Sequence, residues 1–204
     1  MISYRHKFIY IHPPKTAGNS IQSSLAEFCD DEIVERPSVG NVLDEDGCQG
    51  LDVLNLNFNM DKSIQIHAKL QHYAEVLGNE WTQFTIFASI RNPWERVISA
   101  TAFFTPHDLP SRVLEENELV FPEPISRYLE VRGEPSGKIE FIRFENLAAD
   151  FDKICRKLNL KIVKPLPRKN RTKHLPYREY FNEKTKELCA SKYSLDIKMF
   201  DYQF

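Results

Sequence analysis

Three short apolar segments each run directly into a polar turn and then into a helical pattern, and this repeated order constrains the fold most. The segments are KFIYI at 7–11, FTIFASI at 84–90 and KIEFIRF at 138–144. The first two are apolar at nearly every position, which is typical of strands buried on both faces of a parallel sheet. Three strand–turn–helix units predict an α/β fold, a three-layer sandwich with a central parallel sheet covered on both faces by helices.

Periodic apolar residues predict where the helices lie. Apolar residues with the helical spacing i, i+4, i+7 follow the first strand. After the second strand, Asn92 followed by Pro93 makes a favourable helix start. We expect helices at 19–28, 71–77, 93–104, 147–158 and 177–193, and a short further strand at 64–66. The acidic stretch that ends near residue 59 is expected to be irregular, and 105–124 is expected to be a surface excursion.

Charge is uneven along this chain of 204 residues, although its formal net charge is only −2. The total excludes a surface built throughout to bind nucleic acid. The segment 27–61 carries ten acidic residues and one basic residue, whereas 164–178 carries six Lys or Arg and no acid. A nearly neutral chain can therefore still contain a local anion site.

The cysteines, glycines and hydropathy predict one soluble domain over 1–204 in the cytoplasm. The chain has four cysteines and no C-x-x-C pair, which excludes the usual zinc spacings and a disulfide framework. These cysteines are expected in or near the core. The chain has only 7 glycines and no internal repeat. It also lacks a signal-peptide core and the run of about 18 apolar residues that an integral membrane segment needs.

The turn after the first strand has the residues of an anion site. It reads HPPKTAGNS at 12–20, with a lysine, two hydroxyls and small residues before a helix. Backbone N–H groups at a helix N-terminus, together with a lysine, suit a phosphate. The order differs from the nucleotide P-loop because Lys15 precedes Gly18 and the first P-loop glycine is missing. An ordinary helix start with a surface lysine is the alternative.

The junction after the second strand supplies a second basic group. Arg91 follows this strand directly, where a guanidinium can bind a phosphate through two hydrogen bonds. Ser99 lies about two turns into the following helix, and its hydroxyl reaches the same group only if the phosphate lies beside that helix. A salt-bridging arginine and a solvent-facing serine are the alternative.

Taken together, these motifs resemble the sulfotransferases that use 3′-phosphoadenosine 5′-phosphosulfate (PAPS). The resemblance is closest to the carbohydrate branch, of the heparan sulfate 2-O and chondroitin type, and to its bacterial relatives. Five ordered segments carry it: KTAGNS at 15–20, IQIHAKLQHYAEVLG at 64–78, RNPWERVIS at 91–99, FIRFENLAADFDKICRKL at 141–158, and the ending at 177–204. The resemblance implies the fold of this family, which is like that of P-loop nucleotide hydrolases.

The resemblance also implies which residues bind the nucleotide. The 5′-phosphosulfate end would be held by Lys15, Thr16, Ala17, Gly18, Asn19 and Ser20. The 3′-phosphate would be held by Arg91 and Ser99. The basic segment 168–174, with Arg171, Thr172 and Lys173, occupies the position of a loop that closes over the nucleotide in relatives.

The expected reaction is an in-line transfer of a sulfuryl group to a hydroxyl, with no metal. Lys15 would stabilise charge on the bridging oxygen of the leaving group. His67, at the end of the short strand, is the expected general base, and His72 is the weaker candidate. Gln65 stands where some relatives carry a second histidine, and His12 is interpreted as structural or peripheral.

Two other functions remain open from the sequence: a P-loop-like nucleotide-dependent kinase, and a non-catalytic module that binds a glycan or another anion. The expected partners are the nucleotide co-substrate and a glycan or other hydroxyl acceptor, without nucleic acid. The segments 27–61 and 105–135 are expected to shape the acceptor site, because they match the family least. Their acidity favours a neutral or amino-containing glycan over a highly anionic one.

Overall fold

The computed structural model describes residues 1–30, 33–34, 52–53, 67–104, 109–135, 138–162, 165–167 and 174–204. Their contacts divide the chain into two compact units. Unit 1 comprises Met1–Ile90 and Tyr128–Lys169, and unit 2 comprises Arg91–Arg127 and Asn170–Phe204. Each unit has its own core, and the expectation of one domain over 1–204 stays a prediction.

Unit 1 contains a four-stranded mixed sheet. Its strands, in spatial order, are β1 (Ile2–Ser3), β2 (Phe8–Ile11), β5 (Thr85–Ile90) and β8 (Ile139–Arg143). The last three are parallel, as predicted, whereas β1 pairs antiparallel with β2 and makes the sheet mixed. Every residue of β2 is buried, and so is every residue of β5 after Thr85. Burial on both faces explains the continuous apolar runs that predicted these strands.

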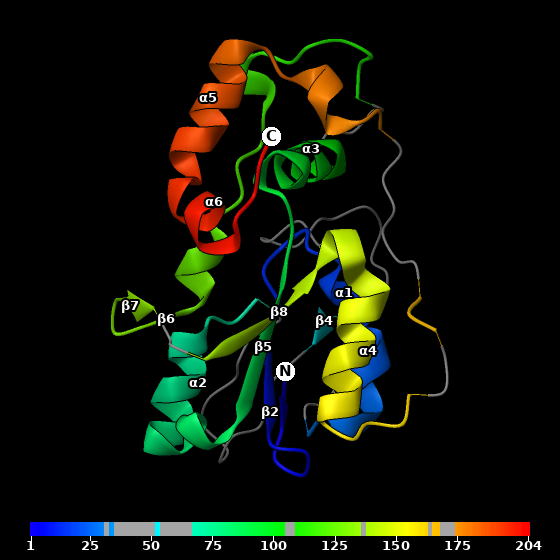
Figure 1. Cartoon of the computed structure of the whole chain (residues 1–204), viewed down its shortest axis with the longest axis vertical. Coiled ribbons are helices and arrows are strands. Elements are labelled where there is room, and N and C mark those ends of the chain that lie inside the picture. Colours follow the sequence, from blue (N-terminus) through cyan, green and yellow to red (C-terminus); the bar gives the residue numbers. More distant parts are fainter. Residues whose placement is uncertain are drawn as a thin grey trace. The chain divides into compact units, whose positions relative to one another are not determined.

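Helices of unit 1 lie on both sides of this sheet, with α1 and α4 on one side and α2 on the other (Figure 1). Their bounds are Gly18–Leu25 for α1, Leu70–Leu77 for α2 and Leu147–Lys157 for α4. The core between the sheet, α1 and α4 includes Phe8, Tyr10, Phe87 and Ile142 from the strands, and Ile21, Leu25, Phe151 and Ile154 from the helices. The expected strand at 64–66 lies outside the described residues.

Unit 2 is helical. It contains α3 (Pro93–Phe104), α5 (Glu183–Lys192) and α6 (Ser194–Phe200). The expected surface excursion at 105–124 is mostly exposed or half-buried where the structure describes it, although Leu109, Leu114 and Leu119 are buried. They pack in one cluster with Trp94, Val97, Ile98, Tyr180, Phe181, Cys189 and Tyr193. Apolar residues without a regular period thus still contribute to the core.

The single helix expected at 177–193 is divided. A 3-10 turn spans Tyr177–Tyr180, and α5 begins only after Asn182, whose Oδ1 accepts a 2.8 Å hydrogen bond from the Thr185 N–H. Asparagine is a preferred N-cap, so this local bond sets the start of α5. In α6 the buried Asp196 accepts hydrogen bonds from the N–H groups of Ile125, at 2.6 Å, and Ser126, at 2.8 Å.

Two short strand pairs and several 3-10 turns complete the described structure. The pairs are β3 (Ile33–Val34) with β4 (Asp52–Val53), and β6 (Glu130–Val131) with β7 (Glu134–Pro135). The other 3-10 turns span Ala26–Phe28, Gly78–Gln83, Glu116–Glu118, Ile125–Tyr128 and Phe144–Asn146. Among the described residues, no helix is both long and apolar enough to cross a bilayer.

Two of the three described cysteines lie in the core, as expected. Cys155 and Cys189 are buried and free, and Cys29 is partly buried. Burial raises the pKa of the Cys155 thiol to about 11 and raises the pKa of Cys189 further. Buried thiols that keep their proton are poor nucleophiles, so these two residues serve packing.

Candidate functional site

The turn between β2 and α1 has a strained backbone. Lys15 and Ala17 adopt left-handed conformations, with φ of 66° and 68°. Residues with a Cβ pay roughly 1–2 kcal/mol in this region. Ala17 is also the N-cap of α1, and its side chain makes no capping hydrogen bond. Left-handed residues before a helix N-terminus turn successive N–H groups to the same side, which is the geometry of an anion-binding turn.

A chain of buried hydroxyl groups fixes this turn to the sheet. Thr16 Oγ1 donates to the carbonyl oxygen of Pro13 at 2.7 Å and lies 2.6 Å from Ser89 Oγ, which lies 2.8 Å from Tyr10 Oη. Each hydroxyl carries one proton, so Ser89 donates to Thr16, and Tyr10 donates to Ser89. Burial raises the pKa of Tyr10 well above its ordinary value, which keeps its donor proton in place. The Thr16 hydroxyl therefore anchors the turn to β5.

Gly18, the first residue of α1, lies against the ring of His12. A Cβ at position 18 would lie 1.6 Å from His12 Cδ2, so only glycine fits there. The His12 ring is 4% exposed and stacks on the ring of Tyr10, with centroids 6.0 Å apart and planes inclined at 12°. Of the two interpretations of His12, the structural one fits this burial and the peripheral one is wrong, because the ring is part of the packing beneath the turn.

His67 lies beside the same turn. Its Nδ1 is 2.8 Å from the carbonyl oxygen of His12, and the two imidazole rings meet edge to face, with centroids 4.7 Å apart. A carbonyl oxygen only accepts, so His67 Nδ1 carries a proton and donates it. The neutral His67 ring then has its lone pair on Nε2, which is the tautomer that a general base needs.

His12 is held neutral by its surroundings. Burial is the largest cause that lowers the pKa of His12 well below its ordinary value, and the N-terminal amine, together with His67 when it is protonated, lowers this pKa further. The Gln22 side chain acts in the opposite direction and raises the pKa of His12. His12 Nδ1 and the Gln22 amide make no hydrogen bond to a described residue. A neutral, buried ring next to the candidate base is thus a fixed part of the site near neutral pH.

His72, the weaker candidate base, has a local structural bond. Its Nδ1 accepts a 3.0 Å hydrogen bond from the backbone N–H of Lys69, which precedes the first residue of α2. This bond satisfies one of the N–H groups that a helix start leaves without an intrahelical partner. The structure therefore gives His72 a role in capping α2.

Arg91 and Ser99 belong to unit 2. Arg91 follows β5 directly in the chain, is 6% exposed, and pairs with Glu95 across 3.3 Å between Nη2 and Oε1. Asn92 Oδ1 accepts hydrogen bonds from the N–H groups of Trp94, at 3.1 Å, and Glu95, at 3.4 Å, so the predicted start of α3 is confirmed. Ser99 is buried within α3.

The structure thus brings together part of the expected site. Lys15–Ser20 and His67 lie together in unit 1, whereas Arg91 and Ser99 lie in unit 2. Arg171, Thr172 and Lys173 lie outside the described residues. Sequence reasoning missed Tyr10 and Ser89, and the only signal for Ser89 was a hydroxyl inside an otherwise apolar strand.

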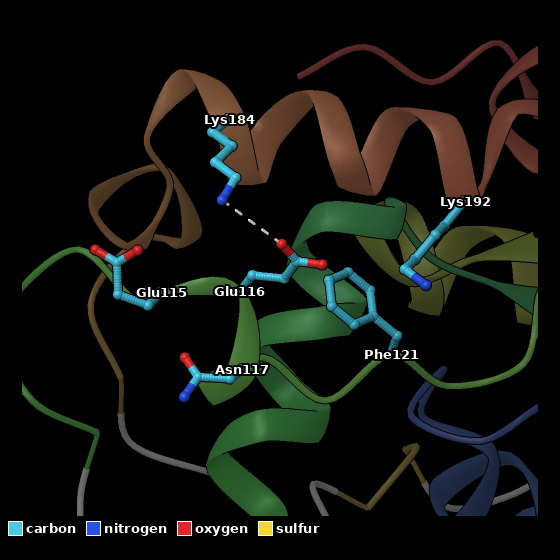
Figure 2. Close-up of a pocket in the computed structure, with 6 residues that line it drawn as sticks. All are labelled: Glu115, Glu116, Asn117, Phe121, Lys184 and Lys192. Atoms are coloured by element: carbon cyan, nitrogen blue, oxygen red, sulfur yellow. Dashed lines mark ion pairs between the residues drawn. The ribbon is translucent and has the colours of Figure 1, made fainter.

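Unit 2 also has an open pocket of about 550 Å³, shown in Figure 2. It is lined by Glu115, Glu116, Asn117, Phe121, Lys184 and Lys192. Lys184 Nζ lies 3.8 Å from Glu116 Oε2, and Lys192 Nζ lies 5.1 Å from the centroid of the Phe121 ring. Two carboxylates and two ammonium groups make the lining nearly neutral overall. No cluster of three or more His, Cys, Asp or Glu suited to a metal occurs among the described residues.

Comparisons of the chain with protein-family models, with curated proteins and with solved structures found no match. The resemblance to PAPS-dependent sulfotransferases therefore stays a prediction, carried by the sequence motifs. Function has to follow from the residues of the site and their geometry.

Proposed function

We propose that this protein is a sulfotransferase that moves the sulfuryl group of PAPS to a hydroxyl of a carbohydrate acceptor. One observation carries the proposal. His67, with Nδ1 bound to the His12 carbonyl, lies beside the strained turn that contains Lys15. A base with its lone pair on Nε2 and an anion-binding turn are the two parts that sulfuryl transfer to an alcohol requires.

The turn suits the 5′-phosphosulfate end of the nucleotide. The left-handed backbone at Lys15 and Ala17 turns backbone N–H groups of the turn toward one side, where an anion can bind. Lys15, Ala17, Gly18, Asn19 and Ser20 would hold this end, together with the backbone N–H of Thr16. The Thr16 side chain, which bonds to Pro13 and Ser89, supports the turn from beneath.

The transfer is a single in-line displacement at sulfur. His67 Nε2 takes the proton of the acceptor hydroxyl as its oxygen bonds to sulfur, and the bond from sulfur to the bridging phosphate oxygen breaks. Adenosine 3′,5′-bisphosphate leaves with the electron pair, and the Lys15 ammonium stabilises the charge that develops on it. The sulfuryl group goes to the acceptor oxygen, and the proton stays on His67.

Two further side chains of the expected site would bind the other end of the nucleotide. Arg91 supports this assignment because it follows β5 directly and has a buried guanidinium group. Arg91 and Ser99 would hold the 3′-phosphate, and the segment with Arg171, Thr172 and Lys173 would close over the nucleotide. The parallel order of β2, β5 and β8 is compatible with the P-loop-like sulfotransferase fold that we propose.

A neutral or amino-containing glycan is the acceptor that the charges favour. The pocket of unit 2 includes Glu115, Glu116 and Phe121, from the segment 105–135 that we expected to shape the acceptor site. Its two carboxylates and two ammonium groups nearly cancel, which suits a neutral chain, and carboxylate and amide groups beside an aromatic ring suit sugar hydroxyls.

The deciding experiment is calorimetric titration with adenosine 3′,5′-bisphosphate and, separately, with ATP and Mg²⁺. We expect tight, metal-independent binding of the bisphosphate and much weaker binding of ATP. Incubation with PAPS and a panel of glycans, followed by mass spectrometry, should then detect addition of a sulfuryl group. Preference for ATP with Mg²⁺ would instead support a kinase. Nucleotide binding without turnover on any acceptor of the panel would favour a non-catalytic module.

A further inference from the structure

The ring of His12 is enclosed on three sides within unit 1. Tyr10 stacks on it, Gly18 lies against its Cδ2 and Nε2 edge, and His67 meets it edge to face with centroids 4.7 Å apart. The ring is almost completely buried. A ring held by these neighbours has little freedom to rotate or tilt, so it presents a fixed surface to His67.

The same residue also fixes the tautomer of His67. The carbonyl oxygen of His12 accepts the Nδ1 proton of His67 at 2.8 Å. A hydrogen bond at one ring nitrogen does not by itself prevent the ring from pivoting about that bond. The edge-to-face contact between the rings limits this pivot, so the hydrogen bond and the packing contact both help to orient His67.

We infer that His12 is the positioning residue of the site, and that its ring holds His67 in the orientation and tautomer required for proton abstraction. The inference rests on the proposed function, because the orientation matters only if His67 is a general base. The contact between the two rings is independent of the proposed function. His12 acts through His67 and does not take part in the proton transfer, because its burial keeps it neutral and its Nδ1 is enclosed by protein.

The direct readout is the ¹⁵N spectrum of the His67 ring in the nucleotide-free protein. In the parent protein, the neutral ring should be almost wholly the Nδ1–H tautomer, whereas free histidine favours Nε2–H. His12→Ala removes the ring but keeps the carbonyl, and should shift His67 toward a mixture of tautomers. His12→Phe keeps an aromatic ring without nitrogen atoms and should largely retain the Nδ1–H form.

The kinetic readout should follow the same order. His12→Ala should lower kcat about 10- to 100-fold, because a misoriented base loses much of its effect, and should change KM for PAPS less than about twofold. His12→Phe should restore most of kcat. If His12→Ala does not fold, His12→Leu fills the volume without an aromatic edge and should give the same result.

The outcomes separate the inference from the proposed function. An unchanged His67 tautomer in a folded His12→Ala or His12→Leu variant would overturn the positioning role, whatever the enzyme's activity. Loss of kcat in His12→Phe with an intact tautomer would also overturn it, because the nitrogen atoms of His12 would then matter. If the parent protein fails to transfer a sulfuryl group from PAPS, the proposed function fails, while the tautomer shift still tests the contact.

Discussion

Gly18 lies so close to the His12 ring that a Cβ at position 18 would be 1.7 Å from His12 Nε2 and 2.4 Å from its Cγ. The glycine of the turn is required by this ring, and not by a left-handed backbone. Gly18→Ala should therefore displace the buried ring or the start of α1 and lower the free energy of unfolding by about 1–3 kcal/mol. Urea unfolding would measure this. A change below about 0.5 kcal/mol would contradict the packing described here.

The neighbouring residue provides the opposite test. Ala17 has a φ of 68°, in the region that glycine adopts without strain. Ala17→Gly should therefore relieve strain and raise the free energy of unfolding by up to about 1 kcal/mol, after the greater entropy of glycine in the unfolded chain is included. The two variants exchange glycine and alanine at adjacent positions, so each serves as the control for the other. Destabilisation by Ala17→Gly would argue against the left-handed turn.

Loss of the Ser89 hydroxyl should destabilise the turn from beneath. Ser89→Ala leaves the buried Tyr10 hydroxyl without its acceptor and Thr16 without the proton that Ser89 donates. An unsatisfied buried polar group costs about 1–3 kcal/mol, which urea unfolding can measure. Ser191→Ala, on the exposed surface of α5, is the matched control and should change stability little. Equal effects of the two substitutions would speak against the hydroxyl chain.

Stability should fall with acidity partly because of His12. Its pKa is lower in the folded protein than in the unfolded chain, so below about pH 6.5 the unfolded chain binds more protons. The stability contributed by neutral His12 is complete above that pH and is lost as the pH falls. The charges that face His12 are His67 and the N-terminal amine. His12→Phe should reduce the slope of the free energy of unfolding against pH by up to about 1.4 kcal/mol per pH unit between about pH 6 and 5. An unchanged slope in that variant would mean that His12 is protonated in the folded state.

Catalysis and nucleotide binding should depend on different residues, catalysis on His67 and nucleotide binding on Arg91. His67→Ala should lower kcat by at least about 100-fold and leave the affinity for adenosine 3′,5′-bisphosphate within about twofold, because a base contributes to proton transfer. Arg91→Ala should weaken that affinity about 10- to 100-fold, as expected for lost charge-assisted hydrogen bonds. Kinetics with PAPS and calorimetry would measure the two effects.

Two matched variants control this comparison. His72→Ala should keep most of the turnover, because His72 Nδ1 caps α2. Arg112→Ala removes an exposed arginine of unit 2 that pairs with Glu118, and should leave nucleotide affinity unchanged. Normal nucleotide binding by Arg91→Ala would refute the 3′-phosphate assignment. A loss of nucleotide affinity in His67→Ala as large as its loss of kcat would refute the assignment of His67 as the base.

Local patterns predicted the main elements of the fold. β2, β5 and β8 lie within a residue or two of the predicted strands, and for β2 and β5 the reason is that continuous apolar runs require burial on both faces. The start of α3 was predicted because the Asn92 cap is a bond to residues two and three positions away. By contrast, β1 has only two residues, too few for a periodic signal. The burial of Leu114 was missed because it depends on a cluster assembled from distant segments.

The sequence by itself determined the strand–turn–helix order, the strained turn's residue types and His67 as the candidate base, since each is a pattern of near neighbours. Only the tertiary structure decided what these residues touch. Thr16 and Ser89 are 73 positions apart, and His12 and His67 are 55 apart. The first pair forms because β2 and β5 are parallel neighbours whose carboxyl ends share one edge of the sheet. That pairing is cooperative and non-local, so spacing along the chain does not encode which hydroxyl anchors the turn or which ring orients the base.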